Sequence, residues 1–273
     1  MNQFKISVLA LAMTSIATTS AMAQSSKTNA WEGAYGQIGV GYGMFVPKIG
    51  NGTAVTPNTA VTPAGTPSPP GPGVPLAAIG YPASISQSAS ASNVNNVNTG
   101  IANIAAGYNF GINESYILGI AATYYPGASS SATGQLSVAP TSMPNSMGGP
   151  TIPVPGASTT ATYNVKNLYS IVFTPGYVID KDRLAYLKLG YSGSTIGLSG
   201  PTLTYQTTNL TGYTVGLGYK QMFTESLYAF GEINYASYGT KNISATLTNG
   251  TVLNGMTISG NGSDVLVGVG YRF

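Results

Sequence analysis

Three charged side chains are spaced as an ion-pair network within a sheet would require. Lys188, Lys220 and Glu232 fall on three consecutive segments of alternating polarity, each a few residues from a short turn. Because successive side chains of a strand point to opposite faces, all three are predicted to share one polar face. We predict an ion-pair network centred on Glu232. It either gates a narrow channel or neutralises buried charge and fixes strand register, and the second role is favoured.

The sequence lacks the residues that most catalytic and metal sites use. It contains neither cysteine nor histidine. Disulfides, thiolate metal sites and a lipid-modified N-terminal cysteine are therefore excluded. Most hydrolytic enzymes use a histidine as the proton-transferring group, and this chain has none. We predict a protein that is not an enzyme and that holds no cofactor or metal.

Composition excludes most soluble classes. Only 6% of the 273 residues are charged, against about 25% in a typical soluble domain. Hydrophobic residues make up 43%, too many for a wholly disordered chain. Beyond the N-terminus no run of 18 or more apolar residues occurs, so spanning helices are not expected. The formal net charge of +3 is too small to argue for nucleic acid as a partner.

The first segment is typical of a secretory signal peptide. Lys5 supplies a basic start, residues 6–17 are mostly apolar, and Ala21-Met22-Ala23 forms a small-x-small cleavage site. We predict that residues 1–23 are removed and that the mature chain, 24–273, begins at Gln24.

Period-two alternation dominates the mature chain. In the last segment Val265, Val267 and Val269 alternate with Asp264 and Leu266. Each such segment is roughly ten residues or longer, the length that a tilted strand needs to cross a bilayer. Strands are predicted at about 34–46, 97–110, 115–125, 163–179, 183–193, 211–223, 227–238 and 263–273.

The positions of the aromatic residues indicate that the apolar face of this sheet contacts lipid rather than a protein core. On the apolar face aromatic residues gather in two girdles at the strand ends, as expected where rings sit at the two water–lipid boundaries. One girdle lies beside the short turns: Tyr108, Phe110, Tyr116, Tyr177, Tyr219, Phe223, Tyr271 and Phe273. The other lies toward the long loops: Tyr42, Tyr124, Tyr163, Tyr169, Tyr191, Tyr213 and Tyr235. The opposite face is polar and would make a poor sandwich core: Asn103, Asn109, Thr123, Ser170, Lys188, Ser192, Lys220, Glu232 and Asn234.

Connection lengths alternate between short and long. Tight links at 111–114, 180–183 and 224–226 separate long ones, as in outer-membrane barrels with short periplasmic turns. The first two long loops, about 47–96 and 126–162, are low in complexity and are predicted to be disordered, with a proline-rich run at 66–72. The other two are 194–210 and 239–262. Asn249-Gly250 in the last one is a two-residue hairpin signal, so the final two strands are expected to extend beyond the membrane.

The first strand, Trp31 to Gly43, and the final Val269-Gly270-Tyr271-Arg272-Phe273 resemble the small outer-membrane β-barrel family of Gram-negative bacteria. This group includes OmpA-like transmembrane barrels, opacity-like surface antigens and porin-family proteins. The resemblance implies that the barrel-assembly machinery reads Tyr271 and Phe273 as an assembly signal. It covers the mature chain apart from the first two long loops.

The fold expected is all-β: a monomeric, eight-stranded, antiparallel up-and-down transmembrane β-barrel with long extracellular loops and both mature termini in the periplasm. Its surroundings would be outer-membrane lipid and lipopolysaccharide. The favoured function is a structural or surface-interaction role through the loops, with a partner that the sequence does not name. The alternative is a small pore: inward glycines leave room for water, whereas inward Tyr186, Tyr228 and Phe230 fill the lumen.

Overall fold

The computed structural model describes residues 28–61, 74–126 and 130–273. The predicted signal peptide and the proline-rich run at 66–72 lie outside the described residues. No helix in the described part of the chain is long and apolar enough to span a membrane. The main strands are β1 (Gly33–Gly50), β4 (Val97–Gly111), β5 (Tyr116–Tyr124), β9 (Ala157–Asp180), β10 (Arg183–Gly200), β11 (Leu203–Met222), β12 (Leu227–Thr246) and β13 (Val252–Arg272).

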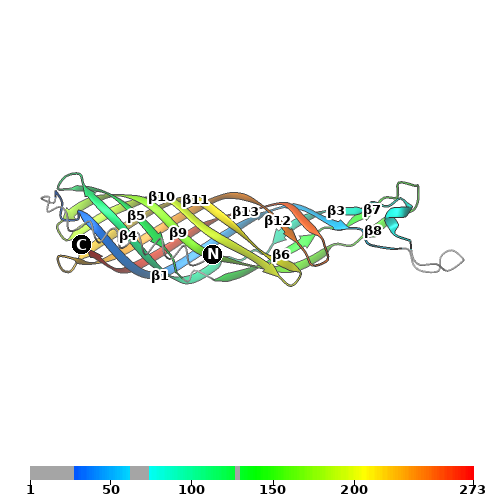
Figure 1. The fold of residues 1–273 in the computed structure, drawn as a ribbon. Helices are drawn as coiled ribbons and strands as arrows, with labels where there is room; N and C mark the ends of the chain where they lie inside the picture. The colour runs from blue at the N-terminus through cyan, green and yellow to red at the C-terminus, as the bar shows by residue number, and fades with distance from the viewer. Residues whose placement is uncertain (1–27, 62–73, 127–129) are drawn as a thin grey trace.

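These eight strands close into a ring. Each is antiparallel to its neighbours, in the order β1-β4-β5-β9-β10-β11-β12-β13, and β13 pairs again with β1. At the closing seam Val40 of β1 has Val267 on one side and Ala102 of β4 on the other. The predicted eight-stranded up-and-down barrel is therefore confirmed. Closure removes the two free edges that an open sheet would have. Figure 1 shows the C-terminus at the same end as the short turns.

The two faces of the barrel have the predicted phase. Val267 on β13 is 58% exposed to the outside, whereas its neighbour Leu266 is fully buried in the lumen. Every residue predicted for the polar inner face is buried. The girdle residues Tyr42, Tyr213 and Tyr271 are exposed on the outer wall, together with most of the other predicted aromatics.

The first two long loops are not disordered where the structure describes them, which corrects the sequence analysis. They contain β2 (Gly52–Pro57), β3 (Ser84–Ser92) and β6 (Ser131–Val138). β2 pairs with β13, β3 with β2 and with β6, and β6 with β9. Alternating Ser, Thr, Ala and Val residues suit a pleated strand, and the long ends of β9 and β13 supply the edges on which these strands pair.

A second ring therefore stands on the first. The ends of β9 to β13 continue past the membrane barrel, and β2, β3 and β6 replace β1, β4 and β5 between β13 and β9. We call the two rings the lower tier and the upper tier. The upper tier is interrupted between β11 and β12, whose ladder stops at Gly212 and Tyr238 and resumes as one bridge from Leu203 to Leu247. Figure 1 shows the upper tier at the end opposite the short turns.

One girdle residue is misplaced by the sequence analysis. Tyr163 was expected outside but is only 1% exposed and lies inside the upper tier. Between Tyr163 and Tyr169 the strand carries a β-bulge, marked by the positive φ of 51° at Asn167 and a register shift opposite Gly193 and Thr195. One extra residue in a strand moves all later side chains to the other face. The bulge therefore turns Tyr163 inward.

The Asn249-Gly250 turn exists, with a longer loop than predicted. Leu247 N donates to Thr251 O at 2.8 Å, so three residues separate the paired positions rather than two. Gly250 has φ 83°, the left-handed conformation that closes a three-residue hairpin loop. Asn249 Oδ1 accepts a hydrogen bond from Thr251 N at 3.0 Å.

A small apolar cluster forms the tip beyond the upper tier. The helix η1 (Leu76–Ile79) packs against the hairpin of β7 (Thr141–Met143) and β8 (Ile152–Val154). Tyr81 joins this cluster and donates its hydroxyl to Pro150 O at 2.7 Å. In Figure 1 the β7–β8 hairpin lies at the far end from the C-terminus.

Candidate functional site in the barrel lumen

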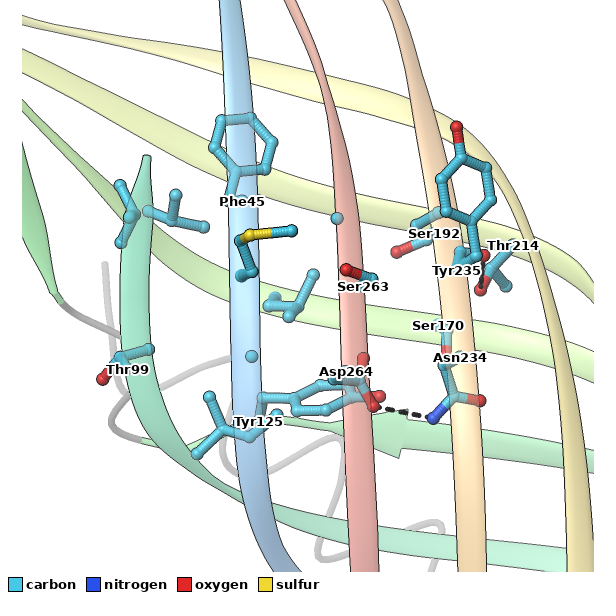
Figure 2. A pocket seen from close by; sticks show the side chains of 18 of the residues that line it. Phe45, Thr99, Tyr125, Ser170, Ser192, Thr214, Asn234, Tyr235, Ser263 and Asp264 are labelled. Atoms are coloured by element: carbon cyan, nitrogen blue, oxygen red, sulfur yellow. Dashed lines mark hydrogen bonds between the residues drawn. The ribbon is translucent and has the colours of Figure 1, made fainter. Parts of the chain in front are cut away.

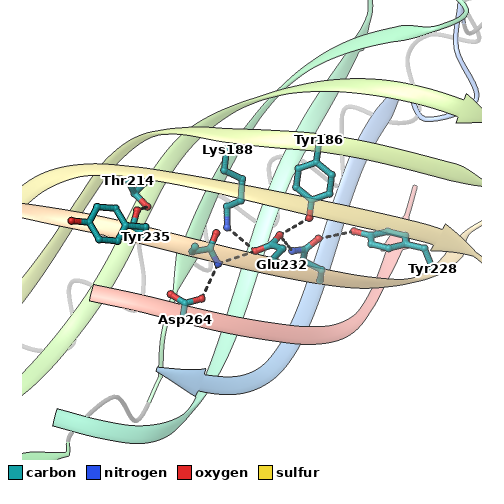
Figure 3. Close-up of polar contacts among 9 residues, drawn as sticks. Tyr186, Lys188, Thr214, Tyr228, Glu232, Tyr235 and Asp264 are labelled. Carbon is teal, nitrogen blue, oxygen red and sulfur yellow. Dashed lines mark hydrogen bonds and ion pairs between the residues drawn. The ribbon is translucent and has the colours of Figure 1, made fainter. Parts of the chain in front are cut away.

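Glu232 is the centre of a buried polar network in the lower tier. Its Oε2 lies 2.7 Å from Lys188 Nζ, and its Oε1 accepts hydrogen bonds from Tyr186 OH at 2.6 Å and Gln37 Nε2 at 3.2 Å. Tyr228 OH donates to Gln37 Oε1 at 3.1 Å. Figure 3 shows Tyr186 and Lys188 converging on Glu232. All are almost completely buried, so the ion pair is shielded from water and its geometry is held by neutral donors.

Glycines make this convergence possible. Gly218 of β11 stands directly between Tyr186 and Glu232 in the register. A Cβ at Gly218 would clash with the Tyr186 ring, so the ring lies across the bare backbone to reach β12. Gly270 hosts the Tyr228 ring in the same way. These inward glycines are occupied by aromatic rings rather than by open water.

Lys220 does not join the ion pair that the sequence analysis predicted. No Lys220 ion pair occurs among the described residues; its Nζ lies 3.7 Å from the centroid of the Tyr35 ring. The Tyr228 and Tyr186 rings are 4.8 and 5.1 Å away. Aromatic faces attract cations, most strongly where water is excluded. Aromatic rings, not the carboxylate, thus hold this buried ammonium group, because Lys188 and neutral donors already surround Glu232.

The N-terminal segment closes the lumen at the short-turn end. Trp31 is 1% exposed and stacks edge-on against Tyr228 at 5.9 Å. Its carbonyl accepts a hydrogen bond from Asn109 Nδ2 at 3.0 Å. Asn29 Nδ2 donates to the carbonyls of Asn113 and of the next residue, both at 2.9 Å. Together these contacts hold the indole in the mouth of the barrel as a plug.

Above the polar network lies a chamber of about 70 Å³. Lys188, Asn234 and Asp264 line its lower part, and Phe45 and Tyr238 line its upper part. Figure 2 shows the Phe45 ring and the Asp264 carboxylate at opposite ends. Farther up, the interior is apolar and closed by two clusters that include Tyr163, Val165, Ile196, Leu210, Leu253 and Met256.

No protein-family model matches the chain, and no curated protein matches it. Three similar solved structures are small outer-membrane β-barrels. The attachment invasion locus protein Ail of Yersinia pestis is 12% identical, with 88% of this chain and 99% of that chain covered and a TM-score of 0.37. The outer membrane protease OmpT of Escherichia coli is 14% identical, with 88% and 96% covered and a TM-score of 0.42. The outer membrane protein OprG of Pseudomonas aeruginosa is 11% identical, with 89% and 97% covered and a TM-score of 0.45.

These likenesses concern the fold alone. The chain resembles small outer-membrane barrels, and its function has to be argued from its own residues.

The C-terminal aromatic pair lies on the outer wall. Tyr271 and Phe273 are both exposed, with ring centroids 5.0 Å apart, and Phe273 N donates to Ala34 O at 3.0 Å. Their role as an assembly signal stays a prediction from the family resemblance.

Sequence reasoning missed several members of the lumen site. Gln37 completes the polar network, Tyr35 is one of the rings around Lys220, and Trp31 forms the plug. Asp264 joins the network by accepting a hydrogen bond from Asn234 Nδ2 at 2.8 Å. Gln37 and Asp264 carried a signal, because both occupy the inward phase of their strands among glycines. Trp31 precedes the alternating part of its strand, so no periodic pattern placed it.

Proposed function

We propose that this protein is a non-enzymatic integral protein of the bacterial outer membrane, whose upper tier and tip contact a surface partner. The observation that carries the proposal is the change in the outer wall. The lower tier exposes Val, Ile, Leu and aromatic side chains between two girdles, whereas the upper tier exposes mainly Thr, Ser and Asn. An apolar band of this kind is stable in lipid, and a hydroxyl-rich wall is stable in water.

The orientation proposed places both mature termini and the short turns in the periplasm. The tip of η1, β7 and β8 then stands farthest from the cell. The apolar band would contact lipid and lipopolysaccharide, and one ring closed on itself needs no second copy. From Ile49 to Ile112 and again from 126 to 162 the sequence has no charged residue. A partner would therefore be recognised through hydrogen bonds and apolar contacts, with weak dependence on salt.

An epitope tag tests this orientation. A tag between Gly148 and Gly149, in the β7–β8 turn, should bind antibody on intact cells. A matched tag after Thr224, in a short turn, should bind only after the outer membrane is permeabilised. Equal labelling of both tags on intact cells would contradict the proposal.

The pore alternative is opposed by the filled interior. Trp31 closes one end, and the apolar clusters of the upper tier close the other. We expect no discrete conductance steps from the refolded chain in a planar bilayer. Reproducible steps from verified folded protein would restore the pore hypothesis. Trp31→Ala is a stricter test. This variant should also show no conductance steps, because the upper closure remains when the plug alone is removed.

The absence of histidine from the whole sequence supports a non-enzymatic role. The Glu232 carboxylate accepts hydrogen bonds from Lys188, Tyr186 and Gln37, which suits a structural role better than proton transfer.

A further inference from the structure

The chamber above the polar network has an uneven charge distribution. Glu232 is satisfied, with donors from Lys188, Tyr186, Gln37 and more distantly Asn234. Asp264 accepts one hydrogen bond from a described residue, Asn234 Nδ2, and makes no ion pair with one. A carboxylate largely withdrawn from water is stable when a cation or several donors face it. The chamber therefore presents one carboxylate that makes no close ion pair with a described residue.

Aromatic and apolar groups surround this carboxylate. Tyr125 and Tyr238 line the same chamber, and in Figure 2 the Tyr125 side chain reaches toward Asp264. Aromatic rings beside a carboxylate favour an organic ammonium ion, because both attract positive charge. Val97, Ile101 and Val165 line the rest and offer contact to an alkyl group.

The size of the chamber limits the ligand. A volume of 70 Å³ accommodates roughly five water-sized groups. A short unbranched amine has this size, with one charged end and one apolar end that match the polar and apolar ends of the chamber.

The wall beside the chamber has an opening in its hydrogen-bond ladder. β4 pairs with β5 only from Ile104 onward. Among the described residues, positions 97–103 have a ladder partner on the β1 side alone. Val97, Thr99 and Ile101 on this stretch line the chamber. The stretch lies level with the Tyr42 girdle, since Tyr42 pairs with Gly100. The chamber is therefore bordered here by a stretch of β4 that has no described partner on the β5 side.

We propose that the chamber is a binding site for short primary alkylammonium ions, with the ammonium group on Asp264 and the alkyl chain among Val97, Ile101 and Phe45. Lys188 also lines the chamber, but its charge is balanced by Glu232. The ammonium group of the ligand gives Asp264 a close ion-pair partner. This site is independent of the surface role proposed for the upper tier.

Isothermal titration of the refolded chain in detergent at neutral pH tests this site. The probes are n-butylamine, n-butanol and sodium butyrate, which share one alkyl chain and differ in charge. We expect butylamine to bind with one-to-one stoichiometry and the other two to bind at least about tenfold more weakly, because they lose the charge-assisted hydrogen bond. Equal binding of butanol, tighter binding of butyrate, or no binding of butylamine would each overturn the proposal.

Substitutions in the chamber separate the contribution of the Asp264 charge to binding from the contribution of the available space. Asp264→Asn should weaken butylamine binding at least about tenfold. Ser170→Leu should abolish it by filling the space, since Ser170 lines the chamber and its hydroxyl makes no hydrogen bond with a described residue. Asp182→Asn, the same chemical change in an exposed turn, is the control and should bind like the unmodified chain. Circular dichroism and unfolding confirm that each variant is folded. Unchanged binding by folded Asp264→Asn would show that the carboxylate plays no part.

Discussion

The lower and upper tiers share the five strands β9 to β13 and have opposite polarity. In the lower tier Glu232 and Lys188 are buried inside, while Val267 and its neighbours are exposed outside. In the upper tier the interior is apolar, with Leu253 and Met256 buried, and the exterior is rich in hydroxyl and amide groups. A β-strand with one apolar face is thus compatible with either arrangement. The surrounding solvent decides which face turns inward.

Two bulges lie between the tiers, and a third lies within the upper tier. β9 has its bulge at Asn167, and β12 has one between Tyr238 and Lys241. β13 has one at Gly255, where φ is 69°. Each bulge moves the following side chains to the other face. The strands therefore change from a lipid-facing to a water-facing pattern without leaving the sheet.

The largest effect is expected where the lower tier buries charge. Lys188→Met leaves the Glu232 carboxylate without its cation and should cost about 3–5 kcal/mol in the free energy of unfolding, measured by urea titration in lipid vesicles. The double variant with Glu232→Gln should recover most of this loss. If the double variant is as unstable as Lys188→Met alone, the charge is not the cause.

A smaller effect should distinguish the two outer walls. Val267→Arg places a charge on the apolar band and should cost about 2–4 kcal/mol. Thr207→Arg makes a similar change on the exposed wall of the upper tier, where surface substitutions usually stay within about 0.5 kcal/mol. The same urea titration measures both. Equal losses would show that the two walls face the same solvent.

The smallest effect concerns the bulge of β13 in the upper tier. Gly255→Ala should cost about 1–2 kcal/mol, because its positive φ disfavours a side chain although nothing lies within 4 Å of the new Cβ. Gly36→Ala in the lower tier is the matched control, with equal space and no positive φ. Unfolding measurements on the two variants should differ by that amount. Equal stability would mean that the bulge does not require a left-handed residue.

Much of the lower tier was predictable because its alternation is regular. Strand number, antiparallel order, the outward phase of Val265 to Val269 and the inward phase of Lys188 and Glu232 all follow from period two. The predictions fail where this period breaks or where packing decides. Tyr163 lies beyond a bulge, and Lys220 is held by three rings from other strands.

The sequence by itself determines that this chain forms a closed sheet with one apolar face, because alternation, girdle aromatics and scarce charge are local properties of each strand. Only the tertiary structure decides that Trp31 plugs one mouth and that residues of the first two loops pair into an upper tier. The same holds for the Asp264 carboxylate, which faces a chamber. These features depend on contacts between residues far apart in the chain, such as Gln37 with Glu232, and no local pattern records which distant strands become neighbours.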